Sequence, residues 1–143
     1  MPPQTRWHIK SAFVYFAAAM TLGVFLSLGA VMQISRWIAY LSPVFVHLIM
    51  VGWVTQMIIG VIFWMFPIVN RAKPRGSEGL AWATYVLLNV GLILRVLCEP
   101  LNAANPGGLW GWGLVASAVF QWLAAVFFVY NSWPRVKERY RGN

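Results

Sequence analysis

The chain has 143 residues, of which 60% are hydrophobic and only 10% are charged, and its mean hydropathy is +0.66. A soluble domain carries about 25% charged residues, so this composition excludes an ordinary soluble fold and predicts an integral membrane protein. The net charge of +8 is carried by basic residues in short segments beside apolar runs. Such segments indicate membrane orientation, and we expect no nucleic acid as a partner. Cys98 is the single cysteine, which excludes an internal disulfide and a cysteine-only metal site.

Four apolar runs are long enough to cross a bilayer, which takes about 20 residues. They predict transmembrane helices over residues 11–32, 43–69, 78–98 and 109–133. The connectors NRAKPRGSEG and EPLNAANPGG are rich in turn-forming residues. Ser42 followed by Pro43 is typical of a helix start, with the serine as N-cap. The predicted fold is therefore all-α, a single transmembrane domain over residues 1–143 that forms an up-down four-helix bundle with short loops.

The distribution of basic residues predicts how the bundle is oriented in the bilayer. Nine of the eleven Lys and Arg residues lie before the first span, between the second and third, or after the fourth. Only Arg36 lies in a loop on the other side, and Arg95 lies inside the third span. Because basic loops stay in the cytoplasm, we expect both termini to be cytoplasmic. The tryptophans expected to anchor the helix ends at the interfaces are Trp7, Trp37, Trp110, Trp112 and Trp133.

The second span carries one imidazole among hydrocarbon side chains. His47 lies about one helical turn inside this span. It could form an interhelical hydrogen bond, which is worth about 0.6 kcal/mol on average in membranes. It could line a proton path, although no intramembrane carboxylate accompanies it. It could also be an axial ligand of haem iron. The residues alone leave these three explanations open.

The residues that follow His47 divide into two faces at about 100° per residue. One face is an apolar wall next to the histidine, suited to a porphyrin plane or to lipid and core contacts. Its members are Val51, Val54, Ile58 and Met65. The nearly opposite face carries Gly52, Gln56 and Gly60 at a spacing of four residues. Small residues in such a stripe are typical of a helix contact, so we expect this face to pack against another helix.

Other polar residues within the spans have competing explanations. The mid-span amides Gln56, Asn89 and Gln121 are expected to hold helices together by hydrogen bonds. Arg95 lies about one turn inside its span, at a depth similar to that of His47. It could form an ion pair with Glu99, four residues on, while it snorkels towards the interface. Alternatively, its guanidinium could anchor a ligand carboxylate.

His8 lies at the opposite side of the membrane from His47. The two histidines therefore cannot ligate the same iron within one subunit. We expect His8 to be an interfacial residue.

The stretch HLIMVGWVTQMIIGVIFWMFP, residues 47–67, resembles the second helix of subunit I in the haem-copper oxidase superfamily. That helix carries a histidine, a Gly-aromatic pair five residues on, a later glycine and a terminal proline. The resemblance implies that His47 is an axial ligand of a haem b. The accompanying pattern is Gly52, Trp53, Gly60 and Pro67. NVGLILRVLCEP, residues 89–100, also resembles a helix of the related NnrS-type membrane proteins.

The departures from that superfamily limit what the chain does alone. It has one intramembrane histidine, so it lacks the copper ligands and the second haem ligand of a complete oxygen or nitric oxide reductase. We therefore expect no copper, and an enzymatic role only as part of an oxidoreductase. The absence of CxxCH favours haem b over haem c. Arg95 lies where its guanidinium could meet the haem propionates.

The resulting interpretation is a b-type haem protein of a bacterial inner membrane. Its expected work is electron transfer, or the binding or sensing of a diatomic gas such as O₂ or NO. It is expected to act as a homo-oligomer or as a subunit of a larger membrane complex; in a C2 dimer, two copies of His47 could share one haem. A cofactor-free accessory or assembly subunit of a respiratory complex is the main alternative. A small transporter is less consistent, because no inverted repeat is evident.

Overall fold

The computed structural model describes residues 1–32, 36–67 and 76–136, and in these ranges the chain is helical with no strand. It contains four helices that are long and apolar enough to cross a membrane. The second of these, called the composite helix below, joins two α-helical segments through a π-helix. The elements are α1 (Pro3–Met32), α2 (Arg36–Ala39), α3 (Ser42–His47), the π-helix η1 (Leu48–Thr55), α4 (Gln56–Met65), α5 (Glu78–Ala104), α6 (Gly108–Ser132) and the 3₁₀ turn η2 (Trp133–Arg135).

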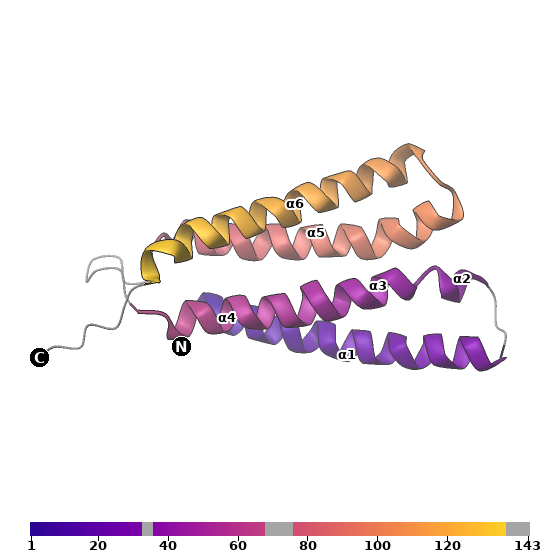
Figure 1. Ribbon diagram of the computed structural model, residues 1–143, viewed down its shortest axis with the longest axis horizontal. Coiled ribbons are helices and arrows are strands. Elements are labelled where there is room, and N and C mark those ends of the chain that lie inside the picture. Colours follow the sequence, from indigo (N-terminus) through magenta and orange to yellow (C-terminus); the bar gives the residue numbers. More distant parts are fainter. Residues whose placement is uncertain (33–35, 68–75, 137–143) are drawn as a thin grey trace, which may run out of the picture.

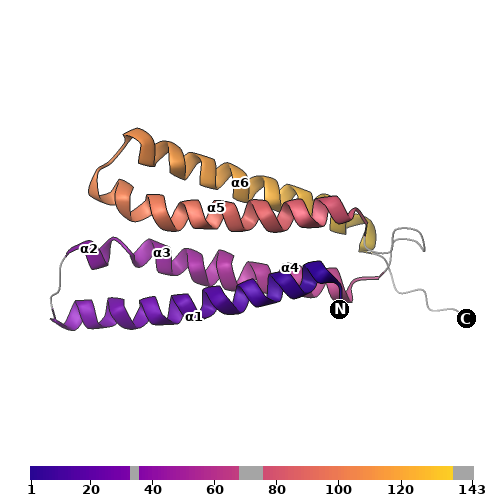
Figure 2. The same cartoon turned by 180° about the vertical axis from the view of Figure 1, so that it is seen from behind.

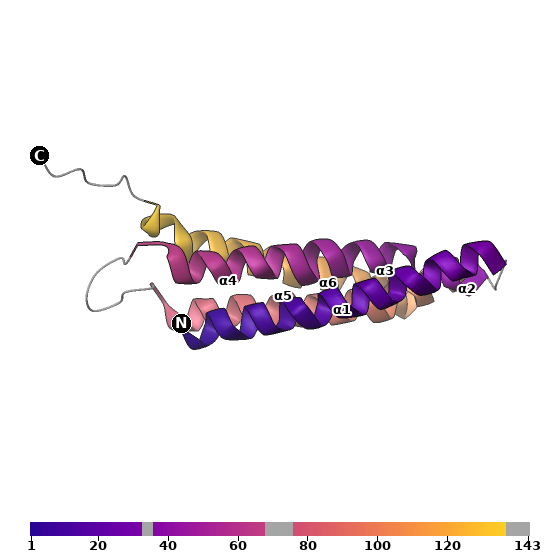
Figure 3. The same cartoon turned by 90° about the horizontal axis from the view of Figure 1, so that it is seen from below.

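The helices form two antiparallel hairpins that lie side by side (Figure 1, Figure 2). One hairpin pairs α1 with the composite helix, and the other pairs α5 with α6. Helix α5 also contacts α1, α3 and η1, so it joins the two hairpins. We call the end that holds the start of α1 and the end of α6 the terminal end, and the opposite end the distal end (Figure 3). The predicted up-down four-helix bundle is confirmed.

Two helix boundaries differ from the prediction. Helix α1 begins at Pro3 rather than at residue 11. Helix α5 runs to Ala104 and contains Pro100, where the sequence predicts a turn. A proline removes one backbone hydrogen bond, but the bond from Asn105 N to Leu101 O at 3.0 Å shows that the helical turn continues beyond it.

The start of α3 also departs from the prediction. Ser42 is its first residue rather than its N-cap, and the helix has no side-chain capping bond, because Leu41 already has helical dihedral angles. The predicted end of the second span, residues 68–69, lies outside the described residues.

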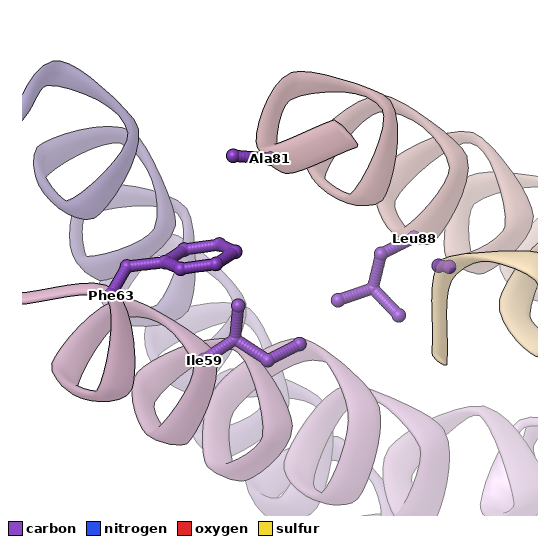
Figure 4. Packing of buried hydrophobic residues seen from close by; sticks show 5 residues of the cluster. Ile59, Phe63, Ala81 and Leu88 are labelled. Carbon is purple, nitrogen blue, oxygen red and sulfur yellow. The ribbon is translucent and has the colours of Figure 1, made fainter. Parts of the chain in front are cut away.

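Two groups of buried apolar side chains hold the bundle together. The group nearer the terminal end joins three helices, and Figure 4 shows how its side chains converge. Its members are Ile59, Phe63, Ala81, Leu88 and Ala124. Towards the distal end, Ala19 of α1 packs with Val44 and Leu48 of the composite helix. Most other large apolar side chains, including the five predicted anchor tryptophans, are exposed on the bundle surface, as a lipid-facing surface requires.

The glycines of the composite helix allow α1 to approach closely. A Cβ built on Gly52 would lie 2.8 Å from the Cβ of Tyr15, and one built on Gly60 would lie 3.1 Å from the Cβ of His8. Gln56, between these glycines, is fully buried. The prediction that this stripe packs against another helix is confirmed, and α1 is the main partner.

Arg135 links the two hairpins at the terminal end. The sequence places it among the loop cations that set orientation, but its side chain is 1% exposed. Its Nε donates to the carbonyl oxygen of Pro67 at 3.1 Å, and its Nη2 donates to those of Phe66 at 2.8 Å and Phe63 at 3.3 Å. A guanidinium can serve several carbonyls because its donors are fixed in a fork. Arg135 therefore caps the end of α4, where unpaired carbonyls accumulate.

Candidate functional site

The helical register changes directly after His47. The π-helix η1 spans eight residues, Leu48–Thr55, and π-helices occur frequently at functional sites. Each i→i+5 turn of the π-helix takes up about one residue more than an α-helical turn. Residues before and after the π-helix therefore do not share the faces that a wheel at about 100° per residue assigns to them. Val51 packs against the buried cluster at the terminal end, whereas Ile58 and Met65 are 50% and 69% exposed. The predicted continuous apolar wall is therefore wrong.

His47 is held in one tautomer by its own helix. Its Nδ1 lies 2.8 Å from the carbonyl oxygen of Pro43. A carbonyl oxygen only accepts, so Nδ1 must carry the hydrogen and donate it. In the neutral imidazole the lone pair is then on Nε2, which makes no hydrogen bond to any residue that the structure describes. Metal-ligating histidines have this arrangement, with one ring nitrogen bound to a carbonyl or carboxylate and the other free for the metal.

Helix α5 brings a carboxylate and a guanidinium to His47. Glu99 Oε2 lies 3.2 Å from His47 Nδ1, and Glu99 Oε1 lies 3.9 Å from Arg95 Nη1. The predicted Arg95–Glu99 pair is confirmed, and because both His47 and Arg95 contact Glu99, so is their similar depth. The sequence analysis does not predict the contact between His47 and Glu99. The similar depth of His47 and Arg95, together with the Arg95–Glu99 pair, is the signal that indicates it.

The three side chains are only partly satisfied by one another. Nδ1 of His47 has one hydrogen, and the Pro43 carbonyl is its nearer acceptor. Arg95 Nε and Glu99 Oε2 are both buried and have no hydrogen-bond partner within the described part of the chain. Such atoms are unfavourable in a low-dielectric region unless a partner arrives. The site therefore retains capacity for a polar group of a ligand.

The depth of this site in the bundle differs from the prediction. Arg95 lies nine residues before the end of α5, about two and a half turns at 3.6 residues per turn. The prediction of one turn is wrong because α5 continues through Pro100.

Two of the three mid-span amides, Gln56 and Asn89, join helices by hydrogen bonds as predicted. Asn89 Oδ1 accepts from Tyr15 OH at 2.8 Å and from Gln56 Nε2 at 3.0 Å, so it ties α5 to α1 and α4. Gln121 instead donates to Ser117 Oγ in its own helix at 3.2 Å, so its predicted role between helices is wrong. Ser117 makes the interhelical bond in its place, to the Gly91 carbonyl at 2.6 Å.

His8 is buried inside the bundle and not exposed on its surface. Its side chain is 0% exposed, and its ring lies edge-on to Tyr85 at 5.1 Å and tilted to Phe63 at 5.9 Å. The prediction failed because α1 begins at Pro3, which places His8 more than one turn inside the helix. His8 packs at Gly60, and Gly60 follows His47 by thirteen positions, which correspond to about 20 Å along a helix. The two histidines thus lie too far apart to share one iron within a chain.

No three His, Cys, Asp or Glu side chains gather as a potential metal centre in the described ranges. Comparison of the chain with protein-family models, with curated proteins and with solved structures found no match. The fold itself defines a multi-pass membrane protein of the helical-bundle class. The chemistry of the site must therefore be inferred from the geometry of His47, Arg95 and Glu99.

Proposed function

We propose that the protein binds haem b and that His47 Nε2 is an axial ligand of the iron. The observation that carries this proposal is the bond from His47 Nδ1 to the Pro43 carbonyl, which leaves the lone pair on Nε2. When bound, haem supplies a one-electron couple and an iron that can bind a diatomic gas. The proposed work of the protein is accordingly electron transfer or the binding or sensing of O₂ or NO.

Glu99 and Arg95 are proposed to tune and retain the haem. A carboxylate 3.2 Å from Nδ1 makes the imidazole a stronger electron donor, which favours ferric iron. The Arg95 guanidinium partly offsets that charge. Its buried, unpartnered Nε also offers a donor to a haem propionate.

The sequence motifs and the position of His8 indicate the type of haem and the oligomeric state that we propose. There is no CxxCH for covalent attachment, which supports haem b. We propose that His47 would be the histidine that this chain supplies to the haem and that any second ligand would come from another copy or subunit, because His8 is about 20 Å away by the count of helical residues. The protein would then act as a homo-oligomer or as part of a larger oxidoreductase, and we propose no copper.

We also propose that both termini face the cytoplasm of a bacterial cell, on the basis of the basic-residue asymmetry. Single cysteines introduced in a Cys98→Ser background test this orientation. An impermeant thiol reagent added from outside should label Asn105→Cys, which is exposed at the distal end, and should miss Lys73→Cys. The reverse pattern overturns the orientation.

The haem proposal is tested by the spectrum of the protein purified in detergent after expression with ample haem. We expect a Soret band and a histidine-ligated spectrum. Glu99→Gln should keep this spectrum and raise the reduction potential, because the imidazole becomes a weaker donor. Arg95→Ala should lower the potential or weaken haem retention. Protein without a Soret band contradicts the proposal.

The contact of His47 with Glu99 at 3.2 Å favours a second candidate, a cofactor-free accessory or assembly subunit. In that case the histidine links α3 to α5 and serves stability alone. The protein would then purify without haem, and both His47→Ala and Glu99→Ala would lower its melting temperature by similar amounts. A double variant no less stable than either single variant would establish the structural pair.

A further inference from the structure

A groove of about 800 Å³ opens on the surface of the terminal end, between the start of α5 and the end of α6. Much of its wall is apolar and comes from Leu80, Trp122, Val126 and Val129. Trp122 is 64% exposed there, which places its ring on the outer surface of the bundle. Because α5 and α6 are membrane-crossing helices, this groove opens toward lipid and not only toward water.

One polar group in the groove has no partner. Asn131 lines the groove and is 5% exposed. Its Oδ1 accepts from the backbone N–H of Ser77 at 2.8 Å, which fixes the orientation of the amide. Its Nδ2 is buried and has no hydrogen bond among the residues that the structure describes. A buried donor without an acceptor is unfavourable, so this part of the groove is suited to a ligand oxygen.

The sequence next to the groove is strongly basic. Six of the eleven Lys and Arg residues lie at positions 71–75 and 137–141, against one acidic residue, Glu138. Arg75 directly precedes Gly76, and Lys137 follows Pro134 by three residues; Gly76 and Pro134 both line the groove. Glu78 lines a separate small pocket beside Phe63. Glu78 directly follows Ser77, which also lines the groove, but the sequence that flanks the groove remains positive in net charge.

We propose that this groove binds an anionic phospholipid. An acyl chain lies along Trp122, Val126 and Val129, and a phosphate or ester oxygen accepts the free hydrogen of Asn131 Nδ2. The amphipathic rings of Tyr130 and Trp133, both highly exposed, lie at headgroup level. The net positive charge of the flanking sequence favours an anionic headgroup over a zwitterionic one. This proposal does not depend on haem.

The test compares phosphatidylglycerol with phosphatidylcholine, each added to the full-length protein in detergent, by counting retained lipid in native mass spectrometry. Asn131→Asp keeps an oxygen for the Ser77 N–H, removes the free donor and adds a negative charge. Its matched control is Asn105→Asp, exposed at the distal end. Val126→Trp fills the apolar part of the groove from a side chain that is 41% exposed, so it should leave the fold intact. Its control is Trp112→Ala, exposed near the other end of α6.

We expect the parent to retain phosphatidylglycerol over phosphatidylcholine by about fivefold or more. Asn131→Asp and Val126→Trp should each reduce the retained phosphatidylglycerol severalfold, and both controls should leave it unchanged. Equal retention of the two lipids by the parent, or unchanged retention in Val126→Trp, overturns the proposal. Displacement of the lipid by an equimolar short-chain quinone also overturns it, because the groove would then be a quinone site.

Discussion

Replacement of Gly52 by alanine tests how closely α1 packs against the composite helix. The new Cβ would lie 2.8 Å and 2.9 Å from the Cβ and Cγ of Tyr15, and 3.0 Å from Cδ2 of Leu92. Carbon atoms in favourable contact are about 3.5–4.0 Å apart. The two Tyr15 atoms lie next to the backbone of α1, and the Tyr15 hydroxyl is bound to Asn89 at 2.8 Å. The clash is therefore relieved only if the two helices move apart.

The size of the effect follows from two opposing terms. Overpacking of this kind destabilises by about 1–3 kcal/mol, and alanine gains about 0.5–1 kcal/mol over glycine within a helix. We expect Gly52→Ala to lower the free energy of unfolding by about 1–2 kcal/mol. Gly79→Ala is the matched control, because its new Cβ would meet nothing closer than Ser77 Oγ at 3.8 Å.

The assay is equilibrium unfolding in mild detergent, followed by far-ultraviolet circular dichroism during titration with a denaturing detergent. The control should be unchanged or slightly more stable than the parent. If Gly52→Ala is as stable as Gly79→Ala, then α1 does not approach the composite helix as closely as described, and the packing argument fails.

Three further substitutions probe the fold. Gly60→Leu should destabilise more than Gly52→Ala, because a Cβ there already lies 3.1 Å from a side chain of α1; an unchanged melting temperature and oligomeric state would contradict this. Asn89→Leu leaves the buried Gln56 without its amide partner and should cost about 1–3 kcal/mol. Adding Gln56→Leu should recover part of the loss in the same unfolding assay, and further loss would refute the pairing. Arg135→Lys should lower the melting temperature, because one ammonium cannot reach the three carbonyls that the guanidinium serves; an unchanged melting temperature would argue against capping of α4.

The parts of the fold that follow from hydrophobic length were predictable. Four apolar runs of sufficient length leave few alternatives to a four-helix bundle, since membrane-spanning backbone must satisfy its own hydrogen bonds. The similar depth of His47 and Arg95 follows from antiparallel neighbours, and their shared contact with Glu99 confirms it. The contact face of Gly52 and Gly60 was predictable because small residues mark close helix approach.

The remaining features depend on tertiary context. A π-helix has no apolar period of its own in the sequence, so an α-helical wheel, which does not apply there, predicts the wrong face for Val51. Pro100 is typical of a helix end, but one lost hydrogen bond is tolerated in the last turns of α5. The burial of His8 and Arg135 depends on which carbonyls and glycines face them across the bundle. The order of residues in the sequence does not show these contacts.

The central claim is that His47 ligates haem iron through Nε2, and the visible spectrum of His47→Gly with and without added imidazole tests it most directly. We expect His47→Gly to lose the histidine-ligated spectrum, and free imidazole to restore it by entering the space that the side chain leaves. His8→Ala is the matched control and should keep the parent spectrum, because His8 lies in the other half of the bundle. A normal histidine-ligated spectrum in His47→Gly without imidazole would contradict the assignment of His47 as the ligand.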